Sequence, residues 1–141
     1  MSTLKTNTLT GTTSAGSINV TGEGGSTTTN LQQGLCKAWF RVNGTGTPAF
    51  TDNCNGSAVT DNGTGDYTVT VTNNMGNANY VSATEVGGGT SSDGSERSIS
   101  GMDGSTARSS SVYRFRHVYH STTSTKYDDQ YNNILHIGDL A

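Results

Sequence analysis

Apolar and polar side chains alternate along several short stretches of the chain, most regularly between residues 35 and 81. The stretch 67–72 reads Tyr-Thr-Val-Thr-Val-Thr, so every second side chain is large and apolar. Successive side chains of a β-strand point to opposite faces, and this pattern is typical of a strand with one buried face. Asn-Gly steps at Asn43 and Asn62 supply the positive φ values that tight hairpins need. The region therefore predicts a β-meander with strands at 35–42, 49–55 and 67–72.

Three further stretches predict strands at 80–86, 111–120 and 133–141. In the last of these, Leu135 and Ile137 are expected to face inward. No stretch has helical periodicity of useful length. The sequence thus predicts an all-β fold, a jelly-roll-like antiparallel β-sandwich of about six or seven strands. One face of the 111–120 strand is expected to enter the core and carries Tyr113, Phe115, His117 and Tyr119.

The first 33 residues differ from the rest of the chain. They contain a short alternating strand at 15–21 and a Gly-rich polar link at 22–30, which we expect to be flexible. Such a stretch cannot bury enough apolar surface to fold alone. We therefore divide the chain into an arm, residues 1–33, and a β-sandwich domain, residues 34–141. In an oligomer, the isolated apolar side chains of the arm are expected to bury against their copies: Leu4, Leu9, Ile18, Val20 and Leu31.

Composition supports a folded, polar-surfaced β protein that assembles with itself. Only 30% of the residues are hydrophobic, but the net charge is −3, far below that of most disordered chains. A core this sparse is marginal for a small monomer, so we expect a homo-oligomer. Apart from Arg114 and Arg116 there is no basic cluster, which argues against nucleic acid as a partner. No stretch is apolar over the length of a membrane span, so we expect synthesis in a cytoplasm and no membrane insertion.

No residue set stands out as catalytic, cofactor-binding or metal-binding. His117 and His120 lie three apart on a predicted strand, on opposite faces, and could not share one metal. The turn at 61–66 lacks the spacing of an EF-hand, although its aspartates leave calcium as a weaker alternative. Asp128 and Asp129 would point apart on an extended strand, and no Gly-x-Ser-x-Gly elbow is present. We expect a protein that is not an enzyme and needs no cofactor.

The two cysteines leave a disulfide open. If Val42 faces Ala49 across the first hairpin, Cys36 faces Asn55, and Cys54 points to the other face. A register shifted by one residue would instead place Cys36 opposite Cys54, where a bridge could form. Reducing synthesis and the simpler register both favour free thiols.

Two places are candidates for contact with partners. Trp39 falls on the strand face opposite Phe40, beside Lys37 and Arg41, where it either packs between subunits, which we favour, or offers a platform for stacking a sugar. Residues 87–110 form the least strand-like region, predicted as an exposed loop or short hairpin. Its candidate outward contacts are Ser92, Asp93, Glu96, Arg97, Met102 and Arg108.

Several segments together resemble the small tail-fibre-type virion proteins of marine bacteriophages and cyanophages. They are the opening Ser-Thr-Leu-Lys-Thr-Asn-Thr-Leu at 2–9, the Thr-Asn-Leu-Gln-Gln-Gly-Leu-Cys-Lys-Ala-Trp-Phe-Arg-Val stretch at 29–42 and its continuation to 47. Val-Thr-Asp-Asn-Gly-Thr-Gly-Asp-Tyr at 59–67, Met-Gly-Asn-Ala-Asn-Tyr at 75–80 and the terminal Ile-Gly-Asp-Leu-Ala at 137–141 complete the resemblance. Residues 87–130 do not share it.

The resemblance implies a trimeric, β-rich component on the exterior of a virion, docked by its arm onto tail or capsid proteins. The β-domain would then be displayed for contact with the host surface, including its glycans. Cys36 and Cys54 depart from the family pattern, and 141 residues leave no room for a long shaft. A short knob or fibre tip fits this length. Two alternatives are a capsid decoration protein that stabilises the shell and a carbohydrate-binding module.

Overall fold

The chain forms two compact units, Met1–Leu35 and Cys36–Ala141. The computed structural model describes residues 3–14, 17–22, 24–25, 27–87, 97–101, 108–119 and 125–140, with the backbone alone for Arg97, Ser100, Gly101 and Tyr119. Most of these residues lie in antiparallel strands, so the predicted all-β class is confirmed.

The first unit contains a small hairpin. Strand β1 (Asn19–Thr21) pairs antiparallel with β2 (Thr28–Asn30), and the Leu31 amide donates to the Ile18 carbonyl at 2.8 Å. The short helix α1 (Leu31–Gly34) follows directly, and the side chain of its N-cap, Asn30, accepts from the Gln33 amide at 3.2 Å. The prediction of a flexible link over 22–30 is therefore wrong for its last three residues, which form a strand.

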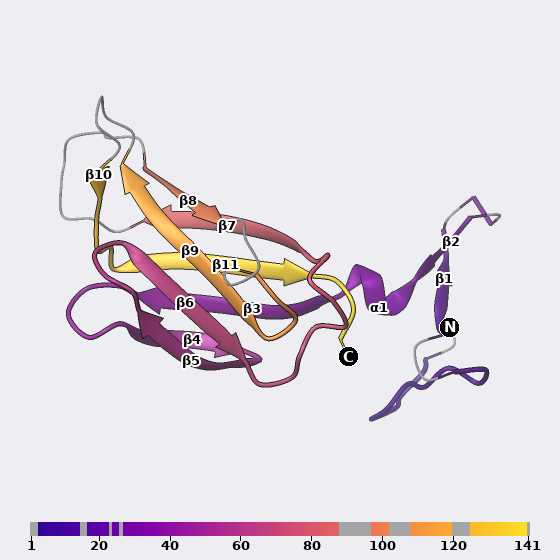
Figure 1. Cartoon of the computed structure of the whole chain (residues 1–141). Coiled ribbons are helices and arrows are strands. Elements are labelled where there is room, and N and C mark those ends of the chain that lie inside the picture. The colour runs from indigo at the N-terminus through magenta and orange to yellow at the C-terminus, as the bar shows by residue number, and fades with distance from the viewer. Residues whose placement is uncertain are drawn as a thin grey trace. The chain divides into compact units, whose positions relative to one another are not determined.

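The second unit is a sandwich-like pair of antiparallel sheets (Figure 1). We name each sheet by its central strand. The β3 sheet has the order β4-β3-β11-β7 and consists of β3 (Cys36–Asn43), β4 (Ala49–Cys54), β7 (Val81–Gly87) and β11 (Tyr131–Ile137). The β9 sheet has the order β10-β9-β6-β5, with β8 also on β9, and consists of β5 (Gly56–Asp61), β6 (Asp66–Val71), β8 (Arg97–Gly101), β9 (Val112–Tyr119) and β10 (Thr125–Lys126).

The predicted meander does not lie in one sheet. After β4 the chain turns at Asn55, whose φ of 65° is the only positive value at a described non-glycine residue, and continues as β5 in the other sheet. The Asn55 side-chain amide donates to the Lys37 carbonyl at 3.2 Å and to the Asn73 carbonyl at 2.9 Å. Asparagine tolerates the left-handed region better than other side chains. This corner therefore places the predicted 49–55 and 67–72 strands in different sheets, with the unpredicted β5 between them.

The core lies between the two sheets and follows the alternation of side chains. Its buried hydrophobic members are Ala38, Phe40, Val42, Tyr67, Val69, Val71, Met75, Tyr80, Tyr113, Phe115 and Ile134. The predicted inward row on β9 is confirmed for Tyr113, Phe115 and His117, whereas the Tyr119 side chain lies outside the described residues.

The inward prediction for β11 is wrong. Ile134 and His136 are buried, while Ile137 is exposed and Leu135 lies on the same outer face. The amide of Asn132, which is also buried, donates to the carbonyls of Val42 at 3.2 Å and Asp129 at 3.0 Å. Because the Asn132 amide nitrogen and His136 Nδ1 have hydrogen-bond partners, the strand can turn its less apolar face inward, although Asn132 Oδ1 and His136 Nε2 have none among the described residues.

The first hairpin adopts a register that neither sequence-based alternative predicted. Val42 pairs with Phe50 and, after a bulge, Trp39 pairs with Cys54. The predicted pairing of Val42 with Ala49 is therefore wrong by one residue. The observed register places Cys54 opposite Trp39, which is further along β3 from Cys36 than either predicted register would place it. Both thiols are free in the structure.

Gly65, at the turn into β6, lies close to the backbone of two other segments of the second unit. Gly65 has a φ of +60°, and a Cβ there would lie 2.7 Å from the Tyr127 carbonyl oxygen and 2.8 Å from that of His117. We expect Gly65→Ala to lower the free energy of unfolding by about 2–4 kcal/mol, because it adds backbone strain and a steric clash. Gly46→Ala is the matched control: Gly46 has a φ of +72° and nothing within 4 Å of a Cβ. Its cost should be about 1 kcal/mol. Equal losses in urea unfolding would contradict this account.

Candidate functional site

The outer face of the β3 sheet carries two parallel rows of side chains that cross all four strands. The first row, which we call the Trp39 row, is apolar and follows from the register of the sheet: Cys54, Trp39, Leu135 and Ala83. The second, the Arg41 row, is polar: Asp52, Arg41, Asn133 and Glu85. Successive outward residues of one strand are about 7 Å apart, so the two rows lie side by side.

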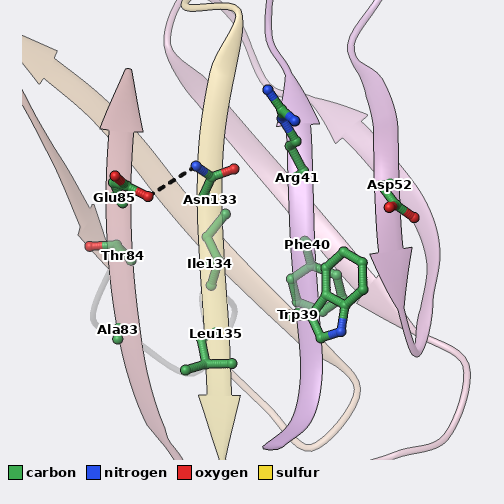
Figure 2. Close-up of a pocket in the computed structure, with 10 residues that line it drawn as sticks. All are labelled: Trp39, Phe40, Arg41, Asp52, Ala83, Thr84, Glu85, Asn133, Ile134 and Leu135. Atoms are coloured by element: carbon green, nitrogen blue, oxygen red, sulfur yellow. Dashed lines mark hydrogen bonds between the residues drawn. The ribbon is translucent and has the colours of Figure 1, made fainter. Parts of the chain in front are cut away.

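A shallow hollow of about 440 Å³ lies over these rows (Figure 2). Trp39, which lines this hollow, is 38% exposed, and Ile134 and Leu135 are also among the lining residues. Figure 2 shows the indole lying along β3 with one ring face turned outward, while Leu135 points out from the neighbouring β11. The predicted orientation of Trp39, away from the core, is therefore confirmed.

The charged side chains of the Arg41 row form no ion pairs with one another among the described residues. Although Arg41 lies directly opposite Asp52, the Arg41 guanidinium sits over the Tyr131 ring, 4.4 Å from its centroid. The Asn133 amide donates to Glu85 Oε2 at 3.3 Å. The Asp52 carboxylate accepts from the backbone amide of Asn53 at 2.9 Å. Several acceptor atoms of Asp52, Glu85 and Asn133 are thus available to solvent or to a ligand.

A second group of charges lies on the outer face of the β9 sheet, around Asp66. Arg114 Nε lies 2.7 Å from Asp66 Oδ1, Arg116 Nε lies 2.8 Å from Oδ2, and Lys126 Nζ lies 3.5 Å from Oδ2. Burial alone would raise the pKa of the Asp66 carboxyl, but the hydrogen bonds and charges of Arg114 and Arg116 outweigh it and lower the pKa to about 2. These ion pairs join β6 to β9 and β10, so the cluster stabilises the sheet.

A partly buried chain of hydrogen bonds links Arg108, Ser82 and His136. The Arg108 guanidinium donates to Ser82 Oγ at 3.1 Å, and Ser82 Oγ lies 2.8 Å from His136 Nδ1. A hydroxyl group can accept two hydrogen bonds and donate one, so the tautomer of His136 sets whether Ser82 Oγ donates to Nδ1 or accepts from it. Burial, and to a smaller degree the charge of Arg108, lower the pKa of His136 to about 4. The ring packs against Tyr80 and Tyr113, each with centroids 4.8 Å away, so it serves as a core side chain.

A second buried polar group joins the 127–129 segment to the β9 sheet. Asp128 accepts from the Tyr67 hydroxyl and, at 2.7 Å, from the Gly65 amide. Burial, followed by the hydrogen bond to Asp128, raises the pKa of Tyr67. His117 Nε2 lies 3.3 Å from Asp129 Oδ2, and both side chains are almost fully buried. Asp128 and Asp129 thus bind different partners, which agrees with the prediction that their side chains point apart.

The predicted contact residues fall into three groups. In the arm, Leu4, Leu9 and Val20 are exposed, whereas Ile18 and Leu31 are half-buried. Arg108 turns its guanidinium over the rings of Tyr80 and Tyr113, at 4.7 and 5.6 Å, so that it packs against the sandwich and is not free at an outer surface. The side chains of the remaining predicted loop contacts lie outside the described residues: Ser92, Asp93, Glu96, Arg97 and Met102.

Sequence reasoning placed Trp39 and Arg41 on one face of their strand but missed the residues that the other strands contribute to the rows, because these depend on the order and register of four strands. It also missed the link between Ser82 and His136, which lie on adjacent strands but 54 positions apart. The sequence could have indicated Asp52 and Glu85 only as charged residues that face outward on predicted strands.

Comparisons with protein-family models, with curated proteins and with solved structures give no match to this chain. Within the described part of the chain, no helix has the length and apolar character needed to cross a membrane. The same residues contain no group of three or more metal-ligating side chains placed to hold an ion.

The Asp66 cluster predicts acid sensitivity in a defined pH range. The folded-state pKa of about 2 lies below the ordinary 3.8, so the stabilisation is complete above pH 3.8 and is lost as the pH falls towards 2. We expect Asp66→Asn to cost about 2 kcal/mol at pH 7 and to remove this acid-dependent loss. Asp52→Asn, at an exposed carboxylate, is the control. The measurement is the free energy of unfolding as a function of pH for each variant. Parallel curves for wild type and Asp66→Asn would refute the prediction.

His136 predicts a loss of stability at milder pH. Its folded-state pKa of about 4 lies below the ordinary 6.5, so the unfolded chain binds the proton first, and stability falls as the pH drops from 6.5 to 4. The loss should reach about 3 kcal/mol. His136→Gln can still hydrogen-bond to Ser82 but does not titrate, so its stability should change less than that of wild type over this range. An unchanged wild-type-like slope in the variant would show that His136 is not responsible.

Proposed function

We propose that the chain is a bacteriophage virion structural protein of the tail-fibre or knob type, which acts by binding and assembly and not by catalytic turnover. In this proposal three copies assemble through the arm, which docks onto other virion proteins. The jelly-roll-like β-domain is then displayed on the exterior of the particle for contact with the host surface.

The observation that carries the proposal is the uncovered apolar surface of the first unit. Leu4 is 78% exposed, Leu9 52% and Val20 50% in an otherwise polar stretch. The same unit has a recess of about 290 Å³ bordered by Val20, Leu31 and Leu35. Burying each such side chain against a partner is worth about 1.5–3 kcal/mol, which supports an arm made for assembly.

The second unit supports the display part of the proposal. Its core, its corner at Asn55 and its charge cluster at Asp66 lie within Cys36–Ala141, so the fold has its own means of stabilisation. Capsid decoration remains a second assignment within the same class, because it would use the same arm and the same displayed domain.

Assembly tests the role of the arm. We expect the purified chain to sediment as a particle of three 14.7-kDa chains, and Leu4→Ser/Leu9→Ser to shift it to the monomer without changing its circular dichroism. Thr3→Ser/Thr10→Ser is a matched control, because it changes neighbouring positions but keeps both leucines. A monomeric wild type, or a variant that remains trimeric, would overturn the proposed arm-mediated trimer.

Location on the particle tests the virion assignment. Immunogold labelling of intact particles should mark either the tail, in few copies, or the shell, in many copies. The tail result supports the fibre or knob assignment, and the shell result supports decoration. Particles that contain none of the protein would exclude both assignments.

A further inference from the structure

The outer face of the β3 sheet places a flat aromatic ring beside a line of hydrogen-bonding groups. A pyranose ring has an apolar C–H face and a rim of hydroxyl groups, each of which can donate and accept. The outward ring face of Trp39, extended by Leu135, can cover the C–H face and remove it from water. Ligand sites commonly combine such an apolar floor with a few polar groups in a hollow of about 300–1,000 Å³. The hollow over the two rows, at about 440 Å³, falls in this range.

The Arg41 row has the donors and acceptors that sugar hydroxyl groups need. Asp52 and Glu85 each use one carboxylate oxygen in a single hydrogen bond, to the Asn53 amide and the Asn133 side chain. Among the described residues, no ion pair joins Arg41 to either of these carboxylates. Hydrogen bonds from hydroxyl groups to carboxylates are charge-assisted and short, so Asp52 and Glu85 are strong potential acceptors.

The charges of the row select the type of sugar. The two carboxylates of Asp52 and Glu85 outnumber the single guanidinium of Arg41, and they would repel sialic or uronic acids. The row crosses four strands spaced about 4.8 Å apart, so its ends are about 14 Å from each other. That distance is longer than a single sugar ring, which favours an oligosaccharide.

The same charges argue against a second copy of the chain as the occupant. The centres of protein interfaces are depleted in charged residues. A protein surface packed over Trp39 would also cover Asp52 and Glu85 and remove their carboxylates from water, at a cost that only matched partners would offset. A sugar leaves the rims of these side chains hydrated and supplies the hydroxyl donors that they lack.

We infer that the face formed by the Trp39 and Arg41 rows is a binding site for a neutral oligosaccharide. Trp39 stacks on a sugar ring, Asp52 and Glu85 accept hydrogen bonds from its hydroxyl groups, and Arg41 donates to its oxygens. The biological role of this site, recognition of a host glycan, rests on the proposed display of the β-domain. Binding itself can be measured on the purified full chain, independently of any virion.

The experiment is a screen of the full chain on an array of neutral and acidic oligosaccharides, followed by titration calorimetry with the best neutral one. Trp39→Ala should weaken binding at least about tenfold, as expected for the loss of one stacking contact. Trp39→Tyr keeps an aromatic ring and should retain most of the affinity. Asp52→Asn and Glu85→Gln preserve shape but weaken the acceptors and should each reduce binding. Tyr127→Ala is the control, because Tyr127 is an exposed aromatic residue that does not line this hollow.

The outcomes of this experiment test the sugar-binding site independently of the proposed virion function. Neutral-sugar binding that follows the order wild type, Trp39→Tyr, Trp39→Ala supports it, with circular dichroism showing that the variants are folded. Absence of neutral-sugar binding by wild type, or equal binding by Trp39→Ala, overturns it. Dissociation of the oligomer by Trp39→Ala would show that the face is a subunit interface and would also overturn it. None of these sugar-binding results depends on where the protein lies on a particle.

Discussion

The inner faces of the two sheets must be filled by a chain in which only 30% of the residues are hydrophobic. This constraint forces polar side chains into the core, where each needs a partner or an aromatic surround. His117 lies against Asp129, and Asn132 donates to the Val42 carbonyl. The ring of His136 lies among aromatic rings and is linked through Ser82 to Arg108. The fold is thus held by a small aromatic core together with polar contacts between segments distant in sequence.

This division explains which parts of the fold could be predicted. Strands with clear alternation, such as β6 and β9, were predicted to within about one residue, because burial of one face dictates the pattern. On β11 the more apolar face, with Leu135 and Ile137, turns outward. The opposite face carries Asn132 and His136, which hydrogen-bond to Val42 and Ser82 on the neighbouring strands of the same sheet. Strand β5 has a single large apolar residue, Val59, and was missed for that reason. The corner at Asn55 depends on bonds to Lys37 and Asn73 that no local pattern encodes.

The outward turn of Leu135 also creates the candidate site. If Leu135 faced inward, Trp39 would stand alone on the outer face, and the hollow would lack its apolar floor. The alignment of Asp52, Arg41, Asn133 and Glu85 likewise depends on the bulge in the first hairpin, which sets the register between β3 and β4. Sequence alone indicated an outward indole, but its neighbours in the candidate site come from the order of four strands.

We expect the Trp39 face to stay open in the oligomer that we propose. Trp39 is the only tryptophan in the chain, so fluorescence excited selectively at tryptophan, and not at the six tyrosines, reports on this face alone. The most direct measurement is acrylamide quenching of the native chain at concentrations below and above its assembly threshold. We predict the same quenching constant at both concentrations, because the indole stays accessible in the proposed oligomer. A constant that falls as the chain assembles would show that Trp39 is buried between subunits and would contradict the account.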